Sequence, residues 1–470
     1  MKTICHLLLR ITIIVLAVVG TVSLALNAFM RGNLEASRQY WHVPESEGRR
    51  TLTLKDGKIA SEAIEAALAQ RKLAVIEFDD GGDYLQRSQR ILATDIIDES
   101  WRKETVIYLY VHGWNHSSDP GRATGDLARF SEFILNLNET RSERTHLGIY
   151  LAWPGDPKRD ILGPVSFPGR RAATNRMASP AFTDTLSYIR KRANQPNHSG
   201  KRKTVVFLGH SFGGRIVERT MTPSIQAYSF LRTQDRIRVE VDGSDESEDL
   251  RKLLLADLTI LINPATEGLH ARKLKLATQR WPQEEFPAII ALTSDSDNNT
   301  GATWAKGKLV ERIFVPTVPS VTREYAMGAS LRESVKEYVA YTVGHDWRLL
   351  NGRVTAGAAA SHGFQLRDDY SGEVSSRFLR LPEEEVKHRL PIGCYLNLRV
   401  SKEILDGHSG SGPSLTSAGG VDLEASVFNS KMSQLIEFFL DEMDAEQSES
   451  QVLELMLQQT DNDYPIPEKW

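Results

Sequence analysis

Seven short apolar runs, each bounded by polar or turn-forming residues, constrain the fold of this chain more than any other feature. They occupy residues 73–78, 105–113, 146–153, 204–211, 258–265, 288–297 and 394–400. The middle runs are nearly continuous in Val, Ile, Leu and Tyr, as expected for strands that are buried on both faces of a parallel sheet. Segments of helical period lie between them, at 122–137, 215–221 and 427–443. Strands that alternate with helices predict an α/β fold built on a doubly wound, mostly parallel sheet.

The composition of the chain changes along its length and divides it into four parts. These are an apolar N-terminal segment (1–32), a polar linker with one helix (33–70), the region that holds the strands (71–443) and an acidic tail (444–470). Within the third part, residues 299–390 are too long for a simple connection between two strands. We expect this segment to be an insertion or cap on the sheet.

The N-terminal segment predicts a membrane helix. Residues 11–30, ITIIVLAVVGTVSLALNAFM, contain no charged side chain and follow Lys2 and Arg10. A helix of this length covers about 30 Å, enough to cross the hydrocarbon core of a bilayer, and the positive charges place its N-terminal end in the cytoplasm. A cleaved signal peptide, with SLA at 23–25 as the cleavage site, is the alternative; a buried helix of a soluble protein is a third interpretation. We expect a membrane-anchored or exported protein whose bulk lies outside the cytoplasm.

Charge and cysteine content exclude some classes of function. The formal net charge is −4 and the isoelectric point is about 6.3, and no basic stripe runs along the sequence, so nucleic acid is not an expected partner. The two cysteines are Cys5, in the apolar segment, and Cys394. We therefore expect no intrachain disulfide, and we expect Cys394 to be a core residue.

One pentapeptide carries the strongest chemical signal. GHSFG, centred on Ser211, matches the pattern G-x-S-x-G between an apolar run and a helical segment, which is the setting of a nucleophile elbow. Small neighbours let the strand and the helix approach each other, while the serine takes a strained backbone conformation. We expect Ser211 to be a nucleophile; a glycine-rich structural turn is the alternative. Ser409 also lies between glycines but follows no buried strand. The residues expected to shape the elbow are Gly209, His210 and Gly213.

A serine nucleophile needs two preorganised donors for the oxyanion that forms. The backbone N–H of Phe212, directly after the serine, is one. His112 and Gly113 end an earlier apolar run, so that the N–H of Trp114 is expected to turn inward as the second donor. The alternative is an ordinary strand end with a stacking tryptophan.

The acid that orients the base is expected after a later strand. The run at 288–297 ends in Asp295 and Asp297, and the later residue is better placed to reach back to a histidine. We favour Asp297 and keep Asp295 and then Glu267 as alternatives. The aspartate that does not serve as the acid would be a turn residue that hydrogen bonds its own backbone.

The base is expected after the acid, in the order Ser, Asp, His. His408 follows the last apolar run and precedes the final helical segment, and it is favoured. His345 is the main alternative, and it lies with His362 and His388 inside the expected insertion. The chemistry is then acyl transfer: His408 takes the Ser211 proton, Asp297 stabilises the imidazolium and water hydrolyses the acyl-serine. No cofactor or metal is required, and no run of His, Asp or Glu shows a convincing metal-ligand spacing.

Several segments together resemble a known family. In chain order they are YVHGWNHSS, GIYLAWPGDP, SFPGRRAATNRMA, FLGHSFGGRIV, NPATEG, TSDSDNNTGATW and VSKEILDGHSG. They resemble the α/β-hydrolase superfamily, in particular a branch of bacterial and fungal serine hydrolases with HGW and GHSFGG motifs, over about residues 73 to 443. The resemblance implies the α/β-hydrolase fold and a triad of Ser211, Asp297 and His408. The segment after WPG is longer than in simple lipases, and residues 299–390 carry no motif of the family.

These patterns predict a lipase-like or esterase-like serine hydrolase that cleaves a carboxylic ester. The substrate is a small-molecule or lipid ester, and the membrane helix is the reason to consider lipids. The alternative from another class is a catalytically silent, membrane-tethered binding or interaction protein on a hydrolase scaffold, because a fold does not imply a function. Peptidase and thioesterase activities remain open.

Overall fold

The structure is a computed structural model of the whole chain. It describes residues 39–44, 50–55, 58–100, 102–121, 125–155, 163–195, 203–242, 250, 253–278, 286–304, 321–324, 330–333, 342–345, 349–356, 364–367, 394–409 and 426–444, with a few positions between 12 and 21.

A central sheet dominates the described part of the chain. Nine strands form it in the order β12-β11-β13-β8-β7-β6-β4-β5-β3, and all neighbours are parallel except β11 and β12. The strands are β3 (Leu73–Glu77), β4 (Thr105–Val111), β5 (Thr145–Ala152), β6 (Lys203–His210), β7 (Leu258–Ile262), β8 (Ile289–Ser294), β11 (Gly352–Ala356), β12 (Phe364–Arg367) and β13 (Tyr395–Val400). Each of the seven expected apolar runs overlaps one of these strands, to within a residue or two at most ends, which confirms the prediction of a mostly parallel α/β sheet.

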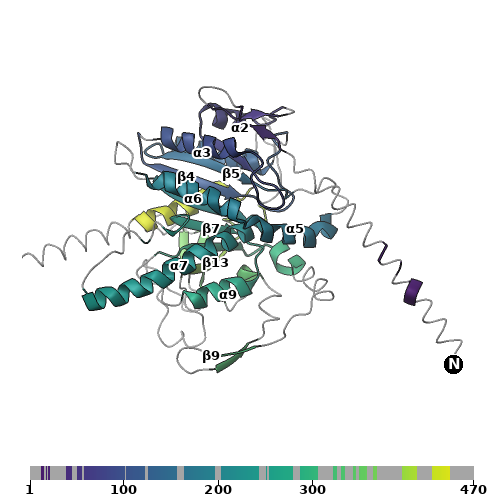
Figure 1. Cartoon of the computed structure of the whole chain (residues 1–470), viewed down its shortest axis with the longest axis vertical. Helices are drawn as coiled ribbons and strands as arrows, with labels where there is room; N and C mark the ends of the chain where they lie inside the picture. The colour runs from purple at the N-terminus through teal and green to yellow at the C-terminus, as the bar shows by residue number, and fades with distance from the viewer. Residues whose placement is uncertain are drawn as a thin grey trace, which may run out of the picture.

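Helices cover both faces of the sheet (Figure 1). One face is covered by α2 (Glu62–Ala69), α4 (Asp126–Thr140) and a helix over 430–444, and the other by α3 (Arg87–Glu99), α5 (Gly163–Met177), α6 (Pro180–Asn194), α7 (Phe212–Asp242) and α9 (Gly268–Ala277). Side chains of β4 alternate between the two cores: Ile107 and Leu109 belong to one, and Tyr108 and Tyr110 to the other. The strands are apolar on both faces because both faces are buried.

Helix α7 is longer than its sequence pattern indicated. The expected helix ended at Met221, just before Pro223, whereas α7 continues to Asp242 with that proline inside it. A proline inside a helix removes one hydrogen bond and costs about 3 kcal/mol. Ile225 and Tyr228, one turn beyond, are fully buried against the core, and their packing offsets that cost.

The described parts of the expected insertion at 299–390 contribute to the sheet itself. Strand β11 pairs with β13 in parallel, and β12 continues the sheet as its antiparallel edge strand. Two further strands, β9 (Val321–Glu324) and β10 (Ser330–Glu333), form a separate antiparallel hairpin. The interpretation as a cap falls largely on residues outside the described ranges.

The segment before the sheet contains short elements that contact it. The expected helix within 33–70 is α2, and β1 (Trp41–His42) pairs with β2 (Thr53–Leu54). The indole of Trp41 is fully buried and donates a hydrogen bond of 2.9 Å to the backbone oxygen of Ser118. The membrane helix expected at 11–30 falls largely outside the described residues, and within these no helix combines the length and the apolar character needed to span a bilayer.

Candidate active site

Ser211 forms a one-residue turn between β6 and α7. The strand ends at His210, the helix begins at Phe212, and Ser211 has a φ of +55°, which is unusual for a residue other than glycine. The surrounding backbone holds this conformation. The Ser211 N–H donates to the Ile262 oxygen at 3.0 Å, and the Ser211 oxygen accepts from the Ala265 N–H at 3.0 Å.

The glycines of the elbow are required by close backbone contacts. A Cβ atom on Gly213 would lie 2.0 Å from the backbone oxygen of Val111, at the end of β4. A Cβ atom on Gly209 would lie 2.7 Å from the Cα of Gly214, where the strand and the helix meet. Both separations are far below van der Waals contact, so any side chain there would push the helix away from the sheet.

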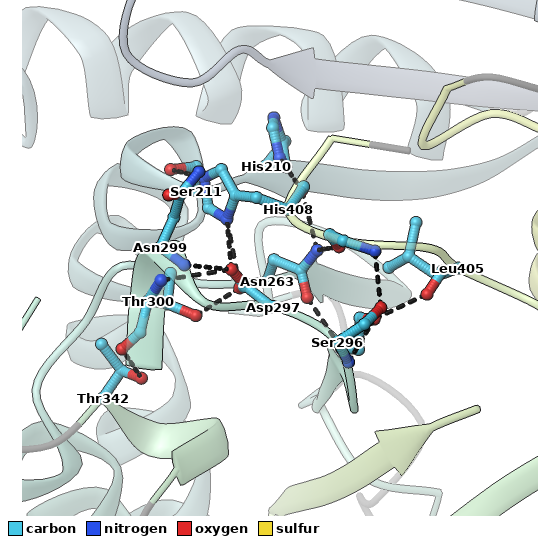
Figure 2. Close-up of polar contacts among 12 residues, drawn as sticks. His210, Ser211, Asn263, Ser296, Asp297, Asn299, Thr300, Thr342, Leu405 and His408 are labelled. Atoms are coloured by element: carbon cyan, nitrogen blue, oxygen red, sulfur yellow. Dashed lines mark hydrogen bonds and ion pairs between the residues drawn. The ribbon is translucent and has the colours of Figure 1, made fainter. Parts of the chain in front are cut away.

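The Ser211 hydroxyl meets an imidazole that the sequence places near the other end of the chain. The Oγ of Ser211 lies 2.8 Å from Nε2 of His408, and Nδ1 of His408 lies 3.1 Å from each carboxylate oxygen of Asp297 (Figure 2). A carboxylate only accepts, so Nδ1 carries the proton of the neutral ring and Nε2 accepts from the serine. The structure therefore brings the favoured serine, aspartate and histidine into one hydrogen-bonded chain.

The Asp297 carboxylate is held in place by its own loop. It is 2% exposed, and it accepts hydrogen bonds from the N–H of Asn299 at 2.9 Å, the N–H of Thr300 at 3.2 Å and the Thr300 hydroxyl. Burial alone would raise the pKa of Asp297, but the hydrogen bond and charge of His408 and the bonds from Thr300 outweigh it and lower the pKa to about 2. The group is ionised at neutral pH.

The side chains of Asn263 and His210 hold the backbone of the loop that carries His408. The Asn263 side chain donates to the backbone oxygens of Gly407 at 3.0 Å and His408 at 2.8 Å, and Nε2 of His210 lies 2.8 Å from the same His408 oxygen. Sequence reasoning missed Asn263. The sequence cue for Asn263 is its position directly after β7, at the sheet edge where the serine and the aspartate also lie. In the structure its φ is +45°.

The alternative acids have other partners. Asp295 is partly exposed and forms ion pairs with Arg353 and, at 3.8 Å, with Arg399. Glu267 is buried and forms ion pairs with Arg171 and Arg215.

Among the alternative bases, His345 lies beside the same loop as Asp297. Its Nδ1 is 3.1 Å from the Thr342 hydroxyl, which donates in turn to the Thr300 oxygen at 3.0 Å. Burial, with Arg399 nearby, lowers the pKa of His345 to about 4. His362 and His388 lie outside the described residues.

The loop after β4 lies directly against the elbow. The ring of His112 is fully buried and stacks on Tyr150 and Trp153, with ring centroids 5.4 and 5.8 Å away. Its Nε2 accepts from the Trp153 N–H at 3.2 Å, so Nδ1 donates to the Gly113 oxygen at 2.9 Å. A Cβ atom on Gly113 would lie 3.1 Å from the Ser211 Cβ. Burial lowers the pKa of His112 to about 4, so the ring is neutral and anchors the loop.

Trp114 and Phe212, the two expected oxyanion donors, are neighbours across the elbow. Their ring centroids are 6.1 Å apart, and Phe212 is also 6.4 Å from the ring of Trp304.

Cys394 is fully buried, without a disulfide, in hydrogen-bond contact with Thr278. This confirms Cys394 as a core residue.

No family model matches this chain, and a search of curated proteins finds no match either. The family resemblance therefore depends on the motifs themselves.

Proposed function

We propose that this protein is a serine hydrolase that cleaves carboxylic esters through an acyl-serine intermediate. The observation that carries the proposal is the 2.8 Å contact between Ser211 Oγ and His408 Nε2, made at a strained strand-to-helix turn. A serine hydroxyl is a weak nucleophile unless a base within hydrogen-bond reach removes its proton. His408 is such a base, and it is itself oriented by an ionised carboxylate.

In the proposed reaction, His408 accepts the proton of Ser211 while Oγ attacks the ester carbonyl. The C–O bond to the alcohol then breaks as His408 returns the proton to the leaving oxygen, and an acyl-Ser211 ester remains. Water, activated by the same imidazole, attacks this ester and releases the acid. Asp297 stays ionised throughout, fixes the ring tautomer and stabilises the imidazolium.

We assign the oxyanion hole to the backbone N–H groups of Phe212 and Trp114. Phe212 is the first residue of α7, so its N–H belongs to the end of the helix that carries partial positive charge. The close approach of Gly113 to Ser211 supports the second assignment, because it brings the β4 loop to the same side of the turn. Oxyanion donors of this kind contribute about 10²- to 10³-fold to the rate.

We further propose membership of the α/β-hydrolase superfamily. Ser211 follows β6, Asp297 follows β8 and His408 follows β13, so the three residues share the carboxyl edge of one parallel sheet. This chain order and the strand–turn–helix elbow are those of that superfamily. The apolar N-terminal segment makes a lipid ester one of the substrates to test.

Labelling with a fluorophosphonate probe tests the proposal. The probe forms a covalent bond only with an activated serine, so we expect the wild-type chain and Ser409→Ala to label, and Ser211→Ala and His408→Ala to remain unlabelled. Hydrolysis of p-nitrophenyl esters graded by chain length then ranks acyl groups. Full labelling of Ser211→Ala would refute the nucleophile, and a folded wild-type protein without labelling or turnover would favour the binding-protein interpretation.

A further inference from the structure

A second cluster of polar side chains lies next to the elbow, where β6, the loop after β4 and the start of α4 meet. It consists of His116 in the loop after β4, Asp126 in the first turn of α4 and His210 at the end of β6. One nitrogen or oxygen atom of each lies within 4.8 Å of the others. Figure 2 shows His210 on the opposite side of His408 from Asp297, and none of the three cluster side chains belongs to the Ser211–His408–Asp297 hydrogen-bond chain.

The hydrogen bonds of His210 fix which of its nitrogens carries the proton. Its Nε2 lies 2.8 Å from the His408 backbone oxygen, and a carbonyl only accepts, so Nε2 is protonated. The Nδ1 of the neutral ring then holds a lone pair. This atom is buried in a residue that is 1% exposed, and it has no hydrogen-bond partner among the described residues. A buried acceptor without a partner destabilises the folded state, and the proposed esterase mechanism gives no reason for it.

In the neighbouring Asp126, likewise, one side-chain atom is hydrogen bonded and another faces the cluster. One of its carboxylate oxygens accepts from the Tyr110 hydroxyl at 2.9 Å, and the other lies 3.4 Å from Nδ1 of His116. That distance is long for a charge-assisted hydrogen bond, which is about 2.7–2.9 Å. It is close to the separation of two ligand atoms that each lie about 2.0–2.1 Å from a tetrahedral ion.

We infer that His116, Asp126 and His210 bind a divalent transition-metal ion of the Zn²⁺ class. Two imidazole nitrogens and one carboxylate oxygen make a three-ligand set with a fourth position for water or a small anion. Nitrogen donors favour such ions over Ca²⁺ and Mg²⁺, which select oxygen ligands.

The surroundings of the cluster are those of metal ligands. A metal-bound histidine usually donates its second ring N–H to a carbonyl or carboxylate, and a metal-bound carboxylate usually accepts a further hydrogen bond. The bonds from His210 to the His408 oxygen and from Tyr110 to Asp126 are of these two kinds. The ion would touch none of the reacting atoms. It would hold the His210 ring and, through its N–H, the backbone of the loop that carries His408.

Metal binding by the purified full-length chain tests the inference directly. After equilibration with Zn²⁺ and removal of excess metal, elemental analysis should find one Zn²⁺ per chain in the wild type. Isothermal titration should show at least tenfold weaker Zn²⁺ binding for His116→Gln and for Asp126→Asn, because each removes one ligand. The Co²⁺-substituted protein should show visible absorption bands of tetrahedral nitrogen and oxygen coordination, and these bands should be lost in both variants.

Two controls separate this site from other binding. His42→Gln changes an exposed histidine outside the cluster and should bind Zn²⁺ as the wild type does. Ser211→Ala should also bind normally, since the cluster does not depend on the nucleophile, so the site can hold even if the proposed activity fails. Zn²⁺ should raise the melting temperature of the wild type but not that of His116→Gln. Because His116 lies in a loop and is partly exposed, this variant should fold, and a loss of Zn²⁺ binding would then not result from misfolding.

Either of two results would overturn the inference. One is a folded wild type that retains less than about a tenth of an equivalent of Zn²⁺ under these conditions. The other is stoichiometric binding that persists unchanged in His116→Gln and Asp126→Asn. In both cases the contact of His116 with Asp126 and the unpartnered Nδ1 of His210 would be features of the fold alone.

Discussion

Asp295 and Asp297 lie two positions apart in one loop, yet their side chains have different surroundings. Asp297 is 2% exposed and accepts hydrogen bonds from His408, Asn299 and Thr300. Asp295 is partly exposed and pairs with Arg353. Position along the turn decides the difference, because the side chain of the later residue is directed back over the sheet edge.

Replacement of Asp297 by asparagine should lower kcat for ester hydrolysis by about 10³- to 10⁴-fold. An amide in place of the carboxylate favours the wrong tautomer of His408 and removes the charge that stabilises the imidazolium. The isosteric Asp295→Asn is the matched control and should change kcat by less than about threefold, since exposed ion pairs contribute little. Equal losses in the two variants would contradict the assignment of the acid.

Glu218 on α7 is a buried carboxyl outside the candidate site. It is 1% exposed and accepts a hydrogen bond from the Thr266 hydroxyl, while the nearby Arg215 guanidinium is paired with Glu267. Burial raises the pKa of Glu218 to about 7, although the Thr266 bond and Arg215 act in the opposite direction. In an unfolded chain a glutamate titrates near pH 4.3. The native state therefore binds a proton between pH 4.3 and about 7 that the unfolded state has lost.

This proton makes the stability of the fold fall as the pH rises through that window. Glu218→Gln removes the titrating group, so its free energy of unfolding relative to wild type should increase from pH 4.5 to pH 7 and level off above. The amplitude should be at most about 4 kcal/mol, from 1.36 kcal/mol per pKa unit. Urea unfolding at several pH values measures it. A difference that stays constant with pH would show that Glu218 is ionised throughout.

At the scale of elements, the elbow depends on the contact between the start of α7 and the end of β4. Gly213 lies where a Cβ atom would meet the Val111 and His112 backbone oxygens at 2.0 and 2.6 Å. One is a backbone atom of a central strand and the other belongs to the residue directly after it, so they have little freedom to move aside. The same contact sets the distance between Ser211 and the loop after β4, whose Trp114 N–H is the second proposed oxyanion donor.

Gly213→Ala should therefore destabilise the protein by about 3 kcal/mol, as overpacking in a core does, and should abolish fluorophosphonate labelling even where the chain still folds. Gly81→Ala is the control: its Cβ would meet only the Asp79 side chain at 3.2 Å, which can move. Guanidinium unfolding and probe labelling of both variants measure these effects. Normal labelling of Gly213→Ala would mean that the elbow tolerates a wider separation.

At the scale of the whole molecule, the parallel sheet collects residues that lie far apart in the sequence. Ser211 and His408 are 197 positions apart, and Asp297 and His408 are 111 apart. All three follow the carboxyl ends of parallel strands, and such ends share one edge of a sheet. The fold thus supplies the proximity, and the loops supply the side chains.

The N-terminal segment gives a prediction for the intact chain in its cell. If residues 11–30 form the proposed anchor, the protein should sediment with membranes and resist extraction at alkaline pH, and N-terminal sequencing should begin at or near Met1. Cleavage after SLA would instead give a soluble exported chain that begins near Leu26. A soluble chain that retains residues 1–32 in the cytoplasm would contradict both interpretations.

The sequence by itself determined the seven parallel strands of the sheet, four of the helical segments and the elbow at Ser211, because apolar periodicity and glycine placement are local properties of a chain. It ranked Asp297 first by its place in the turn and His408 first by chain order, but only the tertiary structure decided which imidazole meets Ser211 and which carboxylate meets that imidazole. The roles of Asn263 and Thr300, the continuation of α7 past Pro223 and the joining of β11 and β12 to the sheet required the structure as well. The cluster of His116, Asp126 and His210 has no recognisable spacing in sequence, and folding alone assembles it. The physical reason is the same in each case: contacts between distant residues depend on how the elements pack, and a local pattern carries no information about that.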